Sequence, residues 1–317
     1  MDNYHQLYKR IIVIVPTVLL TLIWTGCGTD QKADDWILSQ QFSNIVEPTL
    51  LISTDGIEYG GSISARYNEI YHVINDSAWT GSYGVVRTYE NGSFGKEDTL
   101  KFGGETMQGG DIHLSYEGEQ LFFTSRFNTD TTQSDGNIWS TSRTPNGWSD
   151  AKLLPNAVNS ELGEYSPSLS KSGNLYFTRF SEETSGDIFM SEYSNGHYEE
   201  AVSLAGQLNS DSMEADAWVS PSEDFILFVR RSGVDGYGVT DISISFNEAG
   251  IWTAAQVLDE PYNSRGVDGS PILTPDGKYI IFTSNRAAED CTVFDGNLDI
   301  YACPIDIESI KKLHLIN

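Results

Sequence analysis

The chain repeats itself about every fifty residues, and this repetition limits its possible folds more than any other feature. The clearest copies span residues 163–179 and 267–286, where an acid precedes Ser-Pro, an alternating strand pattern, a turn with Gly, an apolar run and an Arg. Looser copies span residues 109–126 and 213–230, and a degenerate fifth spans residues 58–74. Such a period is typical of architectures in which each repeat is one unit that is stable only when stacked on its neighbours.

Two further elements recur after each copy. A short strand-like segment comes first: Asn137–Trp139, Asp187–Phe189, Asp241–Ser243 and Asp299–Tyr301. A glycine turn just before an aromatic residue follows in the first four repeats, at Gly92, Gly147, Gly196 and Gly250, with spacings of 55, 49 and 54 residues. Asn-Gly between two β-rich runs predicts a hairpin, because both central residues need positive φ. Each repeat therefore predicts four short antiparallel strands, named a to d in chain order.

The second strand of each repeat, strand b, is apolar on both faces, as in Leu121-Phe122-Phe123 and Ile226-Leu227-Phe228. A strand buried on both faces needs a sheet packed on each side. Four-stranded units stacked in this way around a circle form a β-propeller. The predicted fold class is therefore all-β: a β-propeller of five four-stranded blades, with six blades as the alternative, and with no helix of useful length after the N-terminal segment.

These repeats resemble the WD-related repeat of TolB-like β-propellers, whose signature is Ser-Pro-Asp-Gly, then an apolar strand and Ser-x-Arg. Thr274-Pro275-Asp276-Gly277 with Ser284-Asn285-Arg286 is the best match, and Ser220-Pro221-Ser222-Glu223 is looser. The resemblance covers roughly residues 46–310 and implies the fold, not a function. TolB itself has six repeats and a preceding α/β domain, so its partners are not carried over.

Ring closure is also predicted. The last repeat has no clear fourth strand, whereas Ile45–Ile52 precedes the first repeat and resembles a d strand such as Ala151–Pro155. We expect this N-terminal strand to complete the last blade. Ser309–Ile316 is the competing segment for the same position.

The N-terminus is typical of an export signal. Lys9 and Arg10 precede the apolar run Ile11–Trp24, which is too short for a comfortable membrane span, and Thr25-Gly26-Cys27 follows. The ending resembles the lipobox of bacterial lipoproteins, which implies a lipid on Cys27. Lys32–Asp35 resembles the acidic surface-routing signals of some Bacteroidetes lipoproteins. An ordinary secretory signal or an uncleaved anchor is the alternative.

The predicted domains are a signal peptide (1–26), a lipidated tether (27–45) and one propeller domain (46–317). The predicted location is the outer membrane, on its periplasmic side or at the cell surface. Cys291 and Cys303 could pair in such an oxidising context, but a turn at Asp295-Gly296 would place Cys291 opposite Ile300 instead.

Charge excludes one class of partner. Lys and Arg number 19 against 45 Asp and Glu, a formal net charge of −26, so nucleic acid is disfavoured because no basic stripe can neutralise phosphates. The predicted partners are an envelope protein or glycan, and the membrane through the lipid anchor.

Acids recur at the start of strand a: Glu58, Glu164, Glu214 and Asp268, with Asp111 two residues after the equivalent Gly109. Arginines end the b strands on the same face: Arg126, Arg179, Arg230 and Arg286. One interpretation is a structural Glu–Arg girdle that fixes blade against blade. The other is an open acidic funnel for a cation or polar ligand.

The b–c loops open on this same face, are unlike one another, and carry aromatic residues, among them Trp79, Tyr237 and Phe294. Unlike loops on a rigid repeat frame are where recognition usually resides. No cofactor is predicted, although the acidic runs Asp130–Asp135 and Glu289-Asp290 have the oxygen ligands for a weak Ca²⁺ site.

No catalytic motif is present in the sequence. The five histidines have no metal-ligand spacing, and no nucleophile elbow, P-loop or Gly-x-Gly-x-x-Gly before a helix occurs. The first functional hypothesis is therefore a non-catalytic binding propeller. The second is a carbohydrate-active enzyme that uses the axial carboxylates, which would need two of them at catalytic separation in an open pocket.

Overall fold

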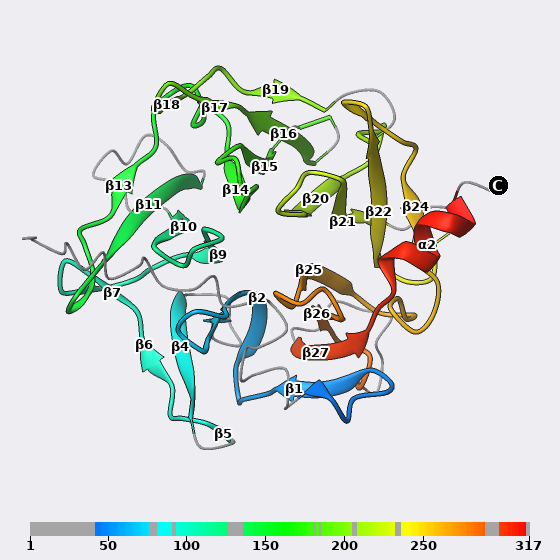
Figure 1. Cartoon of the computed structure of the whole chain (residues 1–317), viewed down its shortest axis with the longest axis horizontal. Helices are drawn as coiled ribbons and strands as arrows, with labels where there is room; N and C mark the ends of the chain where they lie inside the picture. The colour runs from blue at the N-terminus through cyan, green and yellow to red at the C-terminus, as the bar shows by residue number, and fades with distance from the viewer. Residues whose placement is uncertain are drawn as a thin grey trace, which may run out of the picture. The chain divides into compact units, whose positions relative to one another are not determined.

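The structure is a computed structural model, and it describes residues 42–75, 81–90, 93–125, 136–180, 182–183, 185–204, 208–231, 236–288 and 298–314. All of these residues belong to the unit formed by residues 32–317. Their strands form an all-β, propeller-like arrangement of sheets around an axis (Figure 1). Within these residues, no helix is long and apolar enough to cross a membrane.

The predicted a-to-d order is present in the sheets, which we name after their innermost strand. The a strands are β2 (Ile57–Ser64), β9 (Gly110–Leu114), β14 (Glu164–Leu169), β20 (Glu214–Val219) and β25 (Asp268–Leu273). The b strands are β3 (Glu69–Asn75), β10 (Gln120–Ser125), β15 (Leu175–Arg179), β21 (Phe225–Arg231) and β26 (Tyr279–Ser284). The c strands are β4 (Ser82–Glu90), β11 (Asn137–Thr144), β16 (Asp187–Ser191), β22 (Thr240–Glu248) and β27 (Asp299–Pro304).

The outer d strands are short: β6 (Asp98–Thr99), β13 (Lys152–Leu153), β19 (Val202–Ser203), β24 (Gln256–Val257) and β1 (Thr49–Ile52). Two-residue strands extend the predicted Gly turns between c and d: β5 (Ser93–Phe94), β12 (Gly147–Trp148), β17 (Tyr193–Ser194) with β18 (His197–Tyr198), and β23 (Ile251–Trp252). A small hairpin of β7 (Lys101–Phe102) and β8 (Glu105–Thr106) joins β12.

The predicted closing strand is confirmed. β1 pairs with β27 in the antiparallel order β1-β27-β26-β25, so residues near the start of the described chain complete the last sheet. The inner strands also contact one another in sequence, from β2 to β9, β14, β20 and β25, and β25 contacts β2 in turn. The row of sheets therefore closes on itself.

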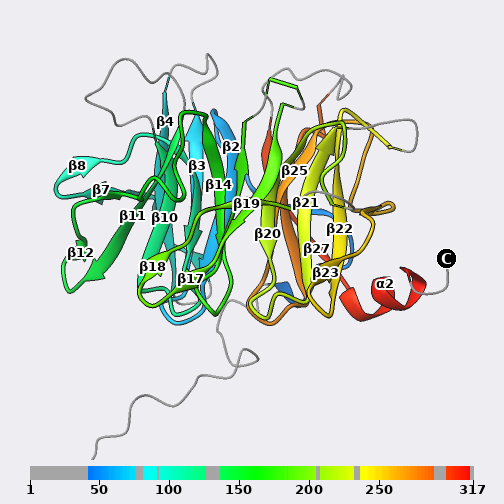
Figure 2. The ribbon, with the colours of Figure 1, turned by 90° about the horizontal axis from the view of Figure 1, so that it is seen from above.

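The described part of the competing C-terminal segment, up to His314, is helical instead, in a short helix that the sequence pattern did not predict. Ile307–His314 form α2, which lies toward the end of the sheets where β17, β18 and β23 lie (Figure 2). Asp306 caps the helix, because its carboxylate accepts a hydrogen bond from the Ser309 N–H at 3.1 Å. Ile307 and Ile310 pack against a buried cluster, so tertiary contacts stabilise a helix that is too short to show a periodic pattern.

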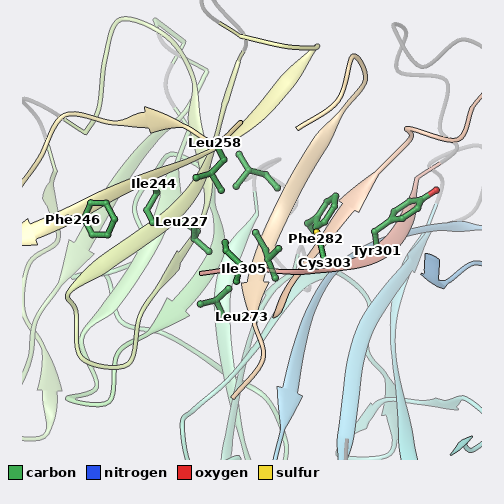
Figure 3. Close-up of a cluster of buried hydrophobic side chains, with 11 residues drawn as sticks. Leu227, Ile244, Phe246, Leu258, Leu273, Phe282, Tyr301, Cys303 and Ile305 are labelled. Atoms are coloured by element: carbon green, nitrogen blue, oxygen red, sulfur yellow. The ribbon is translucent and has the colours of Figure 1, made fainter. Parts of the chain in front are cut away.

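The apolar core is divided among the junctions between sheets, as strand b requires. Leu121 and Phe123 face the β2 sheet, whereas Phe122 between them packs with residues of the β14 sheet. Figure 3 shows the junction of the β20 and β25 sheets, where Leu227, Ile244 and Phe246 pack with residues of the next sheet, among them Leu273, Phe282 and Cys303. The Cys303 thiol there is free and buried, and burial raises its pKa to about 11. Cys291 lies outside the described residues.

At three junctions near the axis, a side chain of one a strand accepts a hydrogen bond from a backbone N–H of the next a strand. Ser62 Oγ accepts from Leu114 N at 3.0 Å, His113 Nε2 from Leu169 N at 2.9 Å, and Ser168 Oγ from Val219 N at 3.0 Å. At the two remaining junctions the equivalent residues are Trp218 and Ile272, which pack against apolar clusters instead. At three junctions, strand a is thus hydrogen-bonded to the a strand of the neighbouring sheet as well as within its own sheet.

Candidate functional site

The acid at the start of strand a is held by a recurring set of donors, which we call the acid clamp. In the β14 sheet, Ser160 donates to Glu164 twice, from its N–H at 3.1 Å and from its hydroxyl at 2.5 Å. Arg179, directly opposite Glu164 in the strand pairing, donates its Nε–H at 2.9 Å. Glu164 is fully buried, so every charge-assisted bond replaces solvation that the carboxylate has lost.

The clamp recurs in the next two sheets. Ser210 and Arg230 hold Glu214, with Arg230 Nε at 3.0 Å from the carboxylate. Ser264, Ser284 and Arg286 hold Asp268 in the same way, with Arg286 Nη2 at 2.9 Å. Both acids are fully buried. These three carboxylates are therefore enclosed between sheets and do not line an open funnel.

The clamp also fixes the linker that enters each sheet. Arg179 donates to the carbonyl of Val158, and Arg286 to the carbonyl of Tyr262, each six residues before the clamped acid. The residue before each linker serine (Ser160, Ser210 and Ser264) is an asparagine. Its side-chain amide bonds both backbone groups of a c-strand isoleucine, as Asn159 does with Ile138 at 2.8 and 3.0 Å. Asn209 and Asn263 do the same with Ile188 and Ile242.

Two sheets depart from the pattern. Glu58 keeps the upstream hydroxyl donor, Thr54, but Ile74 lies opposite it where the other sheets have Arg or Ser. Gly109 takes the place of the acid in the β9 sheet, and a Cβ there would come within 2.1 Å of the Thr124 carbonyl oxygen. Burial raises the pKa of both Glu58 and Glu164. Bonds from Thr54 oppose this rise in Glu58, whereas bonds from both Ser160 and Arg179 oppose it in Glu164.

An axial cavity lies between the a strands, two residues beyond the clamp position. Every a strand is bulged there, and the bulge residue has positive φ: Gly60 (61°), Asp111 (53°), Ser166 (52°), Asp216 (49°) and Ser270 (45°). These residues line a cavity of about 40 Å³ together with His113, Pro167, Trp218 and Pro271, among others. Positive φ at a non-glycine residue costs of order 1–3 kcal/mol and tends to cluster at functional sites.

Asp111 and Asp216 face this cavity and share Ser166 as a donor. The Ser166 N–H donates to Asp111 at 3.2 Å, and the Ser166 hydroxyl donates to Asp216 at 2.8 Å. Ser270 donates to the other oxygen of Asp216 at 2.9 Å. Burial, together with the nearby Asp216 carboxylate, raises the pKa of the Asp111 carboxyl to about 6. The pair thus concentrates negative charge at the axis above that pH.

No cation is contributed by the cavity lining itself. Its histidine, His113, accepts a hydrogen bond through Nε2, and burial lowers its pKa to about 4, so the ring is neutral at physiological pH. Within the part of the chain that the structure describes, no group of three or more His, Cys, Asp or Glu is arranged to hold a metal ion. The cavity is suited to a small, positively charged or hydrogen-bond-donating group.

The remaining predicted site residues are placed as follows. Tyr237 is 40% exposed near the start of β22, where its N–H donates to Asp241 and its hydroxyl donates to Asp259. Trp79, Phe294, Arg126 and Cys27 lie outside the described residues, as do the acidic runs Asp130–Asp135 and Glu289-Asp290. Asp111 lies in the cavity, away from the clamped acids with which it was grouped.

Asp216 and the linker serines were not among the predicted site residues, although both have a recognisable pattern in the sequence. Counting two residues beyond each acid position aligns Asp111 with Asp216, and the intervening bulge makes this position face the axis. Asn-Ser also occurs four to five residues before the acid in three repeats, at 159–160, 209–210 and 263–264. A comparison confined to the acids and arginines leaves these pairs out.

Removing the charge from two clamped acids should destabilise the protein. We expect the double variant Glu164→Gln with Glu214→Gln to lower the free energy of unfolding by about 1–3 kcal/mol per site, because Arg179 and Arg230 lose their counter-charges. Thermal and denaturant unfolding would measure the change, with the exposed Glu192→Gln as control. An unchanged or higher Tm would mean that the acids repel one another in an open ring.

The pH dependence of stability should change when Asp111 is neutralised. The folded-state pKa of Asp111 lies above its ordinary value, so its stabilising contribution is complete at low pH and is lost as pH rises from about 4 through about 6. Asp111→Asn removes this loss and should raise stability at pH 7 by on the order of 2 kcal/mol. Unfolding measured from pH 4 to 8 tests this, with the exposed Asp224→Asn as control. Parallel curves for wild type and Asp111→Asn would contradict it.

Comparison with solved structures identifies the fold. A protein described as TolB from Agrobacterium tumefaciens aligns with a TM-score of 0.51 at 12% identity, over 83% of this chain and 98% of its own. A thermostable family-43 glycoside hydrolase aligns with a TM-score of 0.54 at 12% identity, over 81% and 93% of the two chains. A second glycoside hydrolase gives 0.54 at 9% identity, over 88% and 96%.

No family model and no curated protein sequence matches the chain. At these identities the structural likeness concerns the fold alone, and the same fold carries both binding and carbohydrate-active proteins. Together with the propeller-like arrangement of sheets, the comparisons show that this chain resembles TolB-like and glycoside-hydrolase β-propellers.

Proposed function

We propose that this chain is an envelope-anchored, non-catalytic β-propeller of five blades that binds a protein or a glycan through the face carrying its b–c loops. The observation that supports this most is the acid clamp. Glu164, Glu214 and Asp268 are buried and engaged by serine and arginine donors, so they are unavailable as a general acid, base or nucleophile.

The size of the axial cavity supports the same conclusion. A cavity of about 40 Å³ has room for roughly three water molecules, whereas small-molecule sites commonly measure about 300–1,000 Å³. A sugar ring does not fit there without rearrangement of the inner strands. A single ammonium or hydroxyl group from a larger partner does fit, and Asp111 and Asp216 would pair with it.

The outer part of this face offers a contact surface. Four large side chains at the b–c end of the sheets are substantially exposed: Tyr83 (36%), Leu162 (47%), Phe180 (39%) and Tyr237 (40%). Tyr83 lies near the start of the c strand β4, and the other three lie just before or after strands of the β14 and β20 sheets, so the four come from three sheets around the axis. Aromatic anchors around a polar centre are a frequent composition of protein and glycan contacts.

One observation favours a carbohydrate-active enzyme as the second candidate. Asp111 and Asp216 share one cavity, and the pKa of Asp111 is raised to about 6, in the direction that a catalytic general acid requires. Two of the structurally similar proteins are glycoside hydrolases. Release of nitrophenol from a panel of nitrophenyl glycosides, lost on Asp111→Asn, would favour this candidate over the binding function.

Site-specific photo-cross-linking tests the binding face directly. A photoreactive amino acid at Phe180 or Tyr237 should cross-link to an envelope component in intact cells, because these side chains are exposed at the b–c end. The same amino acid at Tyr193 or Ile251, which are exposed at the c–d turns of the opposite face, is the matched control. A glycan array probed with purified protein covers a carbohydrate partner. Cross-links from the control positions alone would contradict the proposed face.

The proposed anchor is a lipid on Cys27. Replacing it by Cys27→Ser should move the protein from the membrane fraction to the soluble fraction, because the remaining apolar run is only 14 residues long. Fractionation followed by immunoblotting measures this, and Cys303→Ala, which alters a buried core thiol, should stay with the membrane. Unchanged retention of the Cys27→Ser form would indicate an uncleaved anchor.

A further inference from the structure

The junction that closes the ring lacks the arginine found at other junctions. Glu58, at the start of β2, pairs in register with Ile74, whereas Glu164 pairs with Arg179 and Glu214 with Arg230. The backbone contact between neighbouring sheets is present here as at the other junctions. The Glu58 N–H donates to the Leu298 carbonyl at 3.0 Å, and the N–H groups of Glu164 and Glu214 donate in the same way to the carbonyls of Gly136 and Gly186. The first and last sheets therefore meet through an incomplete acid clamp.

The missing arginine leaves one carboxylate oxygen without a partner. Glu58 is fully buried, and its Oε1 accepts from the Thr54 hydroxyl, whereas its Oε2 has no hydrogen-bond partner among the residues that the structure describes. At two complete clamps the arginine also bonds the carbonyl six residues before the acid. The equivalent residue here is Ile52, the last residue of β1, so the clamp does not hold the closing strand.

The charges that face Glu58 are unfavourable for its ionised form. Burial raises its pKa most, bonds from Thr54 oppose this, and the carboxylates of Asp299 on β27 and Glu97 before β6 raise it further. The charge of Glu97 is compensated by its ion pair with Arg87. Asp299 forms no such ion pair among the described residues, so its carboxylate is the main negative charge acting on Glu58. Ionised Glu58 is thus a buried charge with no cation opposite it.

We propose that Glu58 makes closure of the propeller pH-sensitive. Ionisation of its carboxyl loosens the junction between β27 and β2, and it thereby also loosens β1, which pairs with β27. With the carboxyl protonated, the side chain is neutral and the junction is closed. The direction follows from linkage, because a carboxyl whose pKa is raised by folding contributes stability at low pH and loses it as pH rises through the folded-state value. The loosening is local, since the other acids have their arginines.

Hydrogen exchange measured on the full chain at pH 5, 6.5 and 8 tests this, after correction for intrinsic exchange rates. In the wild type we expect the protection of residues 49–58 to fall about tenfold from pH 5 to pH 8, because ionisation of the buried carboxyl destabilises the junction. In Glu58→Gln, which mimics the protonated acid, protection should stay constant and exceed the wild type at pH 8. Ile74→Arg should also raise protection at pH 8, because the new guanidinium completes the clamp.

Residues 164–169 and the variant Glu164→Gln are the matched controls. Protection of that strand should fall less with rising pH than protection of residues 49–58, because bonds from Ser160 and Arg179 oppose the rise in the pKa of Glu164. Glu164→Gln should lower the protection, the opposite sign to Glu58→Gln. The proposal is overturned if wild type and Glu58→Gln show the same pH dependence over residues 49–58, or if both strands open together. A Glu58→Gln chain that does not fold would also overturn it, because the neutral side chain is held to be the native form.

Discussion

The fold depends on b strands that are apolar on both faces. Such a strand cannot leave either face of its sheet in water, so each sheet needs a neighbour on both sides, and the row of sheets becomes stable only when it closes. Alternate residues of Leu121–Phe123 and Ile226–Phe228 enter the clusters on opposite sides of their sheets. β1, which comes from the other end of the described chain, supplies the strand that the last sheet lacks.

Polar groups then fix the relative position of the sheets. Apolar packing alone tolerates sliding, whereas a buried carboxylate that accepts bonds from a linker serine and a strand arginine holds one geometry. That arrangement recurs at Glu164, Glu214 and Asp268, which indicates a structural role. The arginine is absent at Glu58, so the closing junction is held by fewer polar contacts than the other three. Among the acids that the structure describes, Asp111 and Asp216 line the axial cavity, where a ligand could reach them.

Much of the fold was predictable because its determinants are local in sequence. Period-two patterns, Asn-Gly turns and a missing fourth strand are properties of single segments, and they located the strands and the closing segment near Thr49–Ile52. Helix α2 was not predictable, since its eight residues depend on contacts of Ile307 and Ile310 with the core. The candidate site was harder, because a bulge in each a strand decides which side chain faces the axis. The acids with the strongest repeat pattern proved to be buried, and Asp216 was overlooked.

The central claim is that the repeated acids hold sheets together and do not carry out chemistry. A double-mutant cycle on Glu164 and Arg179 tests it most directly, from the free energies of unfolding of wild type, Glu164→Gln, Arg179→Gln and the double variant. The account predicts a favourable coupling of at least about 1 kcal/mol, as expected for a buried, hydrogen-bonded ion pair. Additive effects with no coupling would contradict it and return Glu164 to the set of residues available to a ligand.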